Sequence, residues 1–212
     1  MNTIYLNNPW SLEHHLTEIT DEENDKLIEQ SIYTDEVERP NLEKYNYNCN
    51  LPRTDETMKL KSLFFDLCAK YFLINDGHGN VKPITHLERT CDEHHDASCY
   101  VSTNVRYDNI WHAHLTRSTI NAVYYAQVPD DYGTLSIMDV DGIEKRFPPL
   151  ERYIYLIPGW MVHKPNPCKS SIPRVSVNME LFSTYRPVLN PANWTEEQYG
   201  FLNRKDGSFI LW

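Results

Sequence analysis

The sequence contains no Cys-x-x-Cys pair, which removes the commonest cysteine-based sites. Its cysteines are odd in number and scattered along the chain: Cys49, Cys68, Cys91, Cys99 and Cys168. Neither a disulfide framework nor a cysteine-rich zinc site is therefore predicted, and free thiols are expected.

Basic clusters and long apolar runs are also missing. The chain has 20 basic and 30 acidic residues, so its formal net charge is −10. A phosphate backbone is held mainly by clustered Lys and Arg, so nucleic acid is not an expected partner. The longest apolar run, around residues 153–162, is well short of the roughly 20 residues that cross a membrane. The first residues resemble no signal peptide. We therefore predict a cytoplasmic protein with no membrane partner.

No internal repeat or low-complexity linker divides the 212 residues, which predicts a single domain. We expect a helical support region at 1–97, a β-rich core at 98–182 and an extension at 183–212. The support region contains a predicted surface helix at 20–32, with Thr20 or Asp21 as its N-cap. A second, amphipathic helix is predicted at 56–74, ended by Gly77 and Gly79. Its apolar positions are Met58, Leu60, Leu63, Phe64, Leu67 and Tyr71.

From about residue 98 to 182 the apolar pattern changes to a period of two. Short β-branched and aromatic runs alternate with turn sequences such as PDDYG, DVDG and PNPCKSS, which favours a β-sandwich or jelly roll. The eight predicted strands begin near residues 98, 111, 119, 133, 143, 153, 160 and 173. In the extension we expect a short helix within 190–207 and an edge strand at 208–212, and this tail is a candidate contact in a homodimer.

The run WHAH places His112 and His114 one residue apart in a predicted strand. Alternate residues of a strand point to the same face, so both imidazoles are able to meet one metal ion. Two hydrogen-bonded histidines with no metal would give the same pattern.

A third histidine and an arginine follow in the run 156–181. His163 lies at the predicted end of a strand, and Arg174 opens the next one. Alternation along that strand puts Arg174, Ser176, Asn178 and Glu180 on one face, and Val175, Val177, Met179 and Leu181 on the other. If the helices cover the apolar face, the polar face lines the mouth of a barrel. A buried arginine there requires an anion, and its planar fork suits a carboxylate.

Together these motifs resemble the Fe(II)/2-oxoglutarate-dependent oxygenases, most closely a bacterial and phage subgroup with His-x-His in place of His-x-Asp. The resemblance rests on His-x-His, Tyr124-Tyr125, Gly133-Thr-Leu, Pro158-Gly-Trp-x-x-His163 and Arg174-x-Ser176, and it covers residues 98–182. It implies a double-stranded β-helix, the jelly-roll or cupin-like barrel, with supporting N-terminal helices.

The resemblance also implies roles for single residues. His112 and His163 would bind iron, with His114 at the position of the usual aspartate. Arg174, helped by Ser176, would hold the far carboxylate of 2-oxoglutarate, with Tyr125, or alternatively Tyr124, completing the clamp. The implied cofactors are Fe(II), 2-oxoglutarate as cosubstrate and ascorbate as an additional reductant.

The expected reaction is hydroxylation of a carbon in a small molecule or peptide side chain, with release of succinate and CO₂. Two alternatives remain open: a three-histidine cupin-type dioxygenase that does not use 2-oxoglutarate, and a non-catalytic jelly roll that binds a ligand.

The sequence departs from the family at His114, which replaces the usual aspartate. As a result, three neutral imidazoles bring no negative charge to the metal. Asp139 and Asp108 are the candidates for a compensating carboxylate. Leu115-Thr116 and Asn121-Ala122 also differ from the subgroup's residues, so the substrate is not inherited from it. The pocket edge is expected to include Tyr100, Tyr107, Trp111, Arg117 and Trp160.

Two other histidine clusters carry less weight. Cys91, His94, His95 and Cys99 match no zinc-finger spacing, and His14 and His15 are expected to be exposed.

Overall fold

The computed structural model describes the backbone of most of the chain. The described residues are 2–5, 11–41, 48–71, 73–75, 81–83, 97–105, 109–114, 120–139, 142–159 and 161–181. The predicted tail helix and edge strand, Gly77 and Gly79, and the cluster at 91–95 lie outside these residues.

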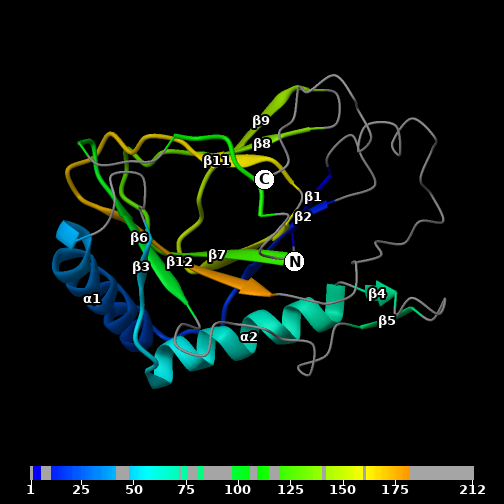
Figure 1. Ribbon diagram of the computed structural model, residues 1–212, viewed down its shortest axis with the longest axis horizontal. Coiled ribbons are helices and arrows are strands. Elements are labelled where there is room, and N and C mark those ends of the chain that lie inside the picture. Colours follow the sequence, from blue (N-terminus) through cyan, green and yellow to red (C-terminus); the bar gives the residue numbers. More distant parts are fainter. Residues whose placement is uncertain are drawn as a thin grey trace.

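Seven antiparallel strands form the larger sheet, in the order β1-β2-β10-β7-β12-β6-β3. Their bounds are β1 Asn2–Tyr5, β2 Ser11–Leu16, β3 Cys49–Asn50, β6 Ser98–Ser102, β7 Ile120–Gln127, β10 Tyr153–Pro158 and β12 Arg174–Leu181. A smaller antiparallel sheet has the order β11-β8-β9, with β8 Leu135–Met138, β9 Glu144–Phe147 and β11 His163–Pro165. A separate hairpin pairs β4 (Leu73–Asn75) with β5 (Val81–Pro83). In Figure 1 the smaller sheet lies on one side of the larger sheet and the helices lie on the other.

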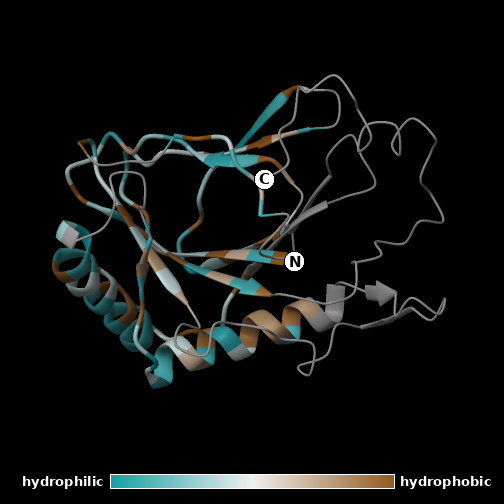
Figure 2. Cartoon of the chain, viewed as in Figure 1, coloured by the Kyte–Doolittle hydropathy of each residue, from teal (hydrophilic) through white to brown (hydrophobic). Residues whose placement is uncertain are grey.

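The two helices are α1 (Asp21–Glu38) and α2 (Asp55–Tyr71). A single 3-10 turn at Arg39–Asn41 follows α1. Both predicted helices are confirmed, and Thr20 is the N-cap of α1, with a capping box to Glu23. The prediction of a plain surface helix is incomplete, because α1 buries a mostly polar face that includes Asn24, Ser31 and Asp35. Figure 2 accordingly shows α1 as mostly hydrophilic, whereas hydrophobic and hydrophilic residues alternate along α2.

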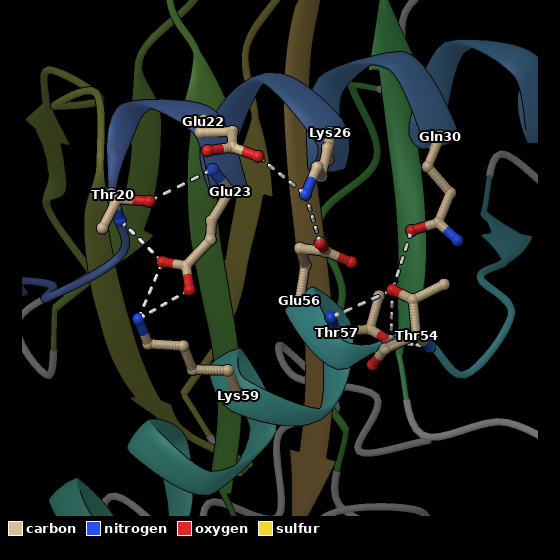
Figure 3. A network of polar contacts seen from close by, with 9 residues as sticks. All are labelled: Thr20, Glu22, Glu23, Lys26, Gln30, Thr54, Glu56, Thr57 and Lys59. Atoms are coloured by element: carbon tan, nitrogen blue, oxygen red, sulfur yellow. Dashed lines mark hydrogen bonds and ion pairs between the residues drawn. The ribbon is translucent and has the colours of Figure 1, made fainter.

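A network of charged and hydroxyl groups joins the two helices near their N-termini (Figure 3). Lys59 Nζ lies 2.8 and 2.7 Å from the two carboxylate oxygens of Glu23. Lys26 bridges Glu22 of its own helix and Glu56 of α2. The beginnings of the helices are therefore held together above the sheet.

Two cores lie on opposite faces of the larger sheet. Between the helices and the sheet, Leu60 and Phe64 of α2 pack with Val175 and Val177 of β12. Between the two sheets, Val123 and Tyr125 of β7 pack with Leu135 and Ile137 of β8. The predicted apolar face of β12 is thus confirmed as the face that the helices cover. Met58 is an exception to the pattern predicted for α2, because 42% of it is exposed at the end of the buried stripe.

Two features of the strand prediction are wrong. The run beginning at Trp111 is not a strand, because only a single bridge, between His112 and His163, gives it β pairing. His163 begins β11 instead of ending the strand before it. Strands β1 and β2, which sequence reasoning missed, extend the larger sheet beyond β10; the side chains of His14 and His15 in β2 lie outside the described ones. None of the described helices is long and apolar enough to cross a membrane.

Candidate metal centre

His112, His114 and His163 converge on one point between the sheets. One nitrogen of each ring lies within 4.8 Å of the corresponding nitrogens of the other two. The ring centroids are 4.5 to 5.2 Å apart. About fifty residues separate His114 from His163. The cluster is therefore assembled by the fold and not by the local sequence. The three histidines thus lie close together, as the sequence predicts.

Backbone hydrogen bonds hold the two histidine segments together. His112 N donates to His163 O at 3.0 Å, and His163 N donates to His112 O at 2.9 Å. His114 N donates to Gly159 O at 2.7 Å, which holds the end of the same segment to the residue that follows β10. These bonds explain why the imidazoles converge although residues 111–114 form no regular strand.

Backbone carbonyls also orient two of the rings. His112 Nδ1 lies 2.9 Å from Ile110 O, and His163 Nδ1 lies 2.8 Å from Met161 O. A carbonyl oxygen only accepts hydrogen bonds, so Nδ1 carries the hydrogen and Nε2 keeps a free lone pair. Burial, reinforced by the two neighbouring imidazoles, holds the pKa of His163 well below its usual value. His163 is therefore neutral near pH 7, which is the form that binds metals.

The third ring has a charged partner. His114 Nδ1 lies 2.8 Å from Glu180 Oε1, and its Nε2 lies 3.5 Å from Asn121 Nδ2. Sequence reasoning placed Glu180 on the cavity face but named Asp139 and Asp108 as candidate carboxylates. Asp139 is wholly buried, lies 3.9 Å from Lys145 Nζ and does not belong to the histidine cluster. Asp108 lies outside the described residues. The carboxylate beside the cluster is Glu180. Its alternation with Arg174 along β12 predicts the cavity face, and the contact with His114 follows only from the fold.

The histidines open into a cavity of about 330 Å³. Its wall includes the predicted polar face of β12 in full: Arg174, Ser176, Asn178 and Glu180. Tyr100 also lines it, as predicted, whereas Tyr107, Arg117 and Trp160 lie outside the described residues. Trp111 is half-buried and does not line the cavity. Its ring instead lies 4.7 Å from Lys164 Nζ.

Among the described residues that line the cavity, Arg174 is the one that carries a guanidinium, and it is only 2% exposed. Its Nη1 donates to Gly133 O at 2.6 Å and to Asn166 O at 3.2 Å. No carboxylate pairs with it among the described residues, although a buried cation normally has an anionic partner. Ser176, two residues along the same face, donates to Tyr100 O at 3.4 Å. The guanidinium therefore offers the cavity an anion site.

The two neighbouring tyrosines of β7 point in opposite directions. Tyr125 lines the cavity, and burial raises the pKa of its hydroxyl while the Arg174 charge opposes that rise. Tyr124 packs in the helix-side core, where its hydroxyl donates to Asn24 Oδ1 at 2.7 Å. Of the two tyrosines predicted for the anion clamp, only Tyr125 lines the cavity.

A bulge follows the two tyrosines along β7. The register of β7 against β12 skips Ala126, because Val175 pairs with Gln127 and Ser176 pairs with Tyr125. Bulges of this kind turn side chains and are frequent beside active sites. The Ala126 carbonyl accepts a hydrogen bond from Asn24 Nδ2 at 3.0 Å, which anchors the bulge to α1.

The free thiols expected from the sequence are present among the described residues, where Cys49, Cys68, Cys99 and Cys168 are all unpaired and buried. Burial raises the pKa of Cys99 to about 12. Cys99 packs in the helix-side core and donates toward Ser31 O.

The fold and the cluster together define a jelly-roll protein with a three-histidine candidate metal site. No known family model matches the sequence, and no curated protein matches it closely enough to count as a relative. Among solved structures, a prolyl-4-hydroxylase from Pseudomonas putida superimposes with a TM-score of 0.54 and 14% identity. The match covers 83% of this chain and 94% of that one. A prolyl 4-hydroxylase from Phytophthora capsici gives a TM-score of 0.44 and 14% identity, over 88% of this chain and 72% of that one.

At this identity the likeness shows the fold, which is the predicted double-stranded β-helix. The donor set itself fits a metal ion, because neutral imidazoles suit iron, zinc, copper and nickel. Two of the rings already present Nε2, and the three donor atoms lie close enough together for one ion to contact all of them.

Proposed function

We propose that the protein is a non-haem iron, 2-oxoglutarate-dependent dioxygenase that hydroxylates a carbon of a small molecule or peptide side chain, releasing succinate and CO₂. The carrying observation is that Arg174, buried and without a carboxylate partner among the described residues, shares one cavity with His112, His114 and His163. A dicarboxylate with a keto group at one end suits this cavity, because one carboxylate can bind Arg174 while the keto end binds a metal held by the histidines.

Each chain group has a defined task in this proposal. The three imidazoles hold Fe(II), and Arg174 binds the carboxylate of 2-oxoglutarate that lies farther from the metal. Tyr125 contributes a hydroxyl to the same cavity, and Ser176, which pairs with Tyr125 across β7 and β12, supports the clamp. The bound iron and keto acid together supply the oxidising power for the C–H bond.

The protein's own contribution to this reaction is orientation. Gly133 O and Asn166 O fix the Arg174 fork, so the cosubstrate meets a prepared anion site. Val123 and Leu135 give the cavity wall an apolar part. One of the solved structures with this fold is named as a prolyl-4-hydroxylase, so we take a prolyl side chain in a peptide as the first substrate class to test.

The test is an anaerobic titration of metal-free protein with Fe(II) and then 2-oxoglutarate. A visible charge-transfer band and tighter metal binding in the presence of 2-oxoglutarate are expected. The Arg174→Met variant is expected to bind the metal but to lose the band at the same 2-oxoglutarate concentration. Arg146→Met is the matched control, because Arg146 is exposed on β9 and pairs with Glu144.

Other outcomes favour the alternatives. If wild type shows no band and 2-oxoglutarate does not tighten metal binding, the proposal is wrong. A substrate-dependent oxygenase activity that Arg174→Met leaves intact would favour a cupin-type dioxygenase without 2-oxoglutarate. A protein that retains only zinc and is inert to keto acids and oxygen would favour a non-catalytic jelly roll.

Five expectations from the sequence stay predictions. They are a cytoplasmic location, ascorbate as additional reductant, the absence of nucleic-acid and membrane partners, a single-domain organisation, and a homodimer contact through the C-terminal tail.

A further inference from the structure

Glu180 and Asn121 lie on either side of the His114 ring, and only Glu180 is within close hydrogen-bond distance of it. The two residues are directly paired across β12 and β7. Glu180 Oε1 lies 2.8 Å from His114 Nδ1, and Asn121 Nδ2 lies 3.5 Å from Nε2. Asn121 is 4% exposed, and the side chains of His114 and Glu180 are 19% and 32% exposed. The contact with Glu180 is thus formed at the cavity wall and is partly shielded from water.

This contact differs in kind from those of the other two histidines. His112 and His163 give their Nδ1 hydrogens to neutral backbone carbonyls, whereas His114 has a carboxylate as its acceptor. A carboxylate that accepts from one ring nitrogen fixes the tautomer and makes the other nitrogen a stronger metal ligand. It also brings one negative charge to a ligand set that otherwise contains none.

We propose that Glu180 is a positioning residue for the metal site, acting through His114. It holds the His114 ring with Nε2 toward the shared metal position, and it supplies through the imidazole the negative charge that the three ligands lack. The proposal deepens the metal site of the proposed function. It concerns the metal alone and holds whether or not 2-oxoglutarate is the cosubstrate.

The experiment is a Co(II) titration of metal-free protein without 2-oxoglutarate or oxygen. Glu180→Gln is the main variant, because its amide oxygen still accepts from Nδ1 while the charge is removed. We expect Co(II) affinity to fall about 10- to 100-fold and the visible Co(II) bands to shift. Glu22→Gln is the matched control, since it removes the same charge from a side chain that is 81% exposed on α1; its affinity and spectrum should equal those of wild type.

A double-mutant cycle with His114→Ala separates action through His114 from direct ligation by Glu180. If Glu180 acts through the ring, Glu180→Gln should change Co(II) affinity less than about twofold in the His114→Ala background, because independent effects would instead add. An undiminished effect in that background, or wild-type affinity in Glu180→Gln alone, would overturn the proposal.

The midpoint potential of the Fe(III)/Fe(II) couple gives a further readout that a merely structural role would not move. It should rise in Glu180→Gln, because a lost negative charge favours the less positive ion, and it should stay unchanged in Glu22→Gln. If the Glu180 variants do not fold, nitrogen NMR of the wild-type imidazoles remains decisive. The Nδ1-protonated tautomer of His114 supports the proposal, and the Nε2-protonated tautomer overturns it.

Failure of this proposal is distinguishable from failure of the proposed function. Loss of the Glu180 effect leaves the 2-oxoglutarate band and its dependence on Arg174 as expected. Conversely, a protein that binds no 2-oxoglutarate can still show the full Glu180 effect on Co(II).

Discussion

Replacing Tyr124 by phenylalanine tests the assignment of the two faces of β7. The change removes one hydroxyl from a side chain that is 0% exposed and leaves Asn24 Oδ1, in a residue 5% exposed, without its donor. A buried polar atom that loses its partner costs about 1–3 kcal/mol of unfolding free energy. For a chain of this size that corresponds to a fall in thermal midpoint of roughly 2–12 °C.

The loss should appear in urea unfolding followed by circular dichroism, as a lower midpoint with an unchanged slope. Metal and 2-oxoglutarate binding should equal those of wild type, because Tyr124 points into the helix-side core. Tyr33→Phe is the matched control, since Tyr33 is 67% exposed on α1. A Tyr124→Phe variant with wild-type stability and weakened 2-oxoglutarate binding would show that the assignment of faces is wrong.

The same substitution should also change how stability depends on pH above pH 10. Burial raises the pKa of Tyr124 to about 12 from a usual value of 10.0. The folded protein therefore keeps a proton that the unfolded chain releases, and the stabilisation is present below pH 10 and lost as the pH rises toward 12. Wild type should lose stability more steeply than Tyr124→Phe over that interval.

Three further predictions concern other parts of the molecule. Glu23→Gln should lower the thermal midpoint near pH 7, because Lys59 and Thr20 hold the pKa of Glu23 at about 2 against a usual 4.5. The difference in thermal midpoint between wild type and this variant should be full above pH 4.5 and should vanish as the pH falls toward 2. Gly133→Ala should weaken 2-oxoglutarate binding and lower the urea midpoint, since a Cβ there would meet the Asn166 carbonyl oxygen at 1.9 Å beside the Arg174 contact; unchanged binding would contradict this. Cys99, with its pKa raised to about 12, should resist iodoacetamide near pH 8 in folded protein and react in urea, as mass spectrometry of the labelled peptides would show.

The parts of the fold that followed from sequence are those with a strong local period. The alternation from Arg174 to Leu181 predicted both faces of β12 correctly, because a period of two has only one solution when one face is covered by helices. The helix α2 followed from its apolar spacing in the same way. Strands β1 and β2 were missed, because the pairing of β2 with β10, to which β1 adds as the edge strand, is decided by distant contacts and not by their own composition.

The site was predictable to a similar degree. Motif order predicts that His112, His163 and Arg174 lie together, and it favours Tyr125 over Tyr124; all four preferred residues line one cavity. The error over the compensating carboxylate has a physical cause: Asp139 is close in sequence to β8, but its partner is Lys145. Glu180 reaches His114 because the segment at 109–114 is bonded to His163 of β11 and to Gly159, which brings its imidazole to β12. Such a contact depends on three separate segments, and no single stretch of sequence encodes it.

The reciprocal backbone bonds between His112 and His163 have a thermodynamic consequence. They order both histidine segments when the chain folds, so a metal ion meets a site whose backbone is already in place. Metal binding should therefore be a single fast step with a small heat-capacity change, because little surface is newly buried. Unfolding should in turn release the metal in the same cooperative transition, and the metal should raise the thermal midpoint in proportion to the logarithm of its concentration.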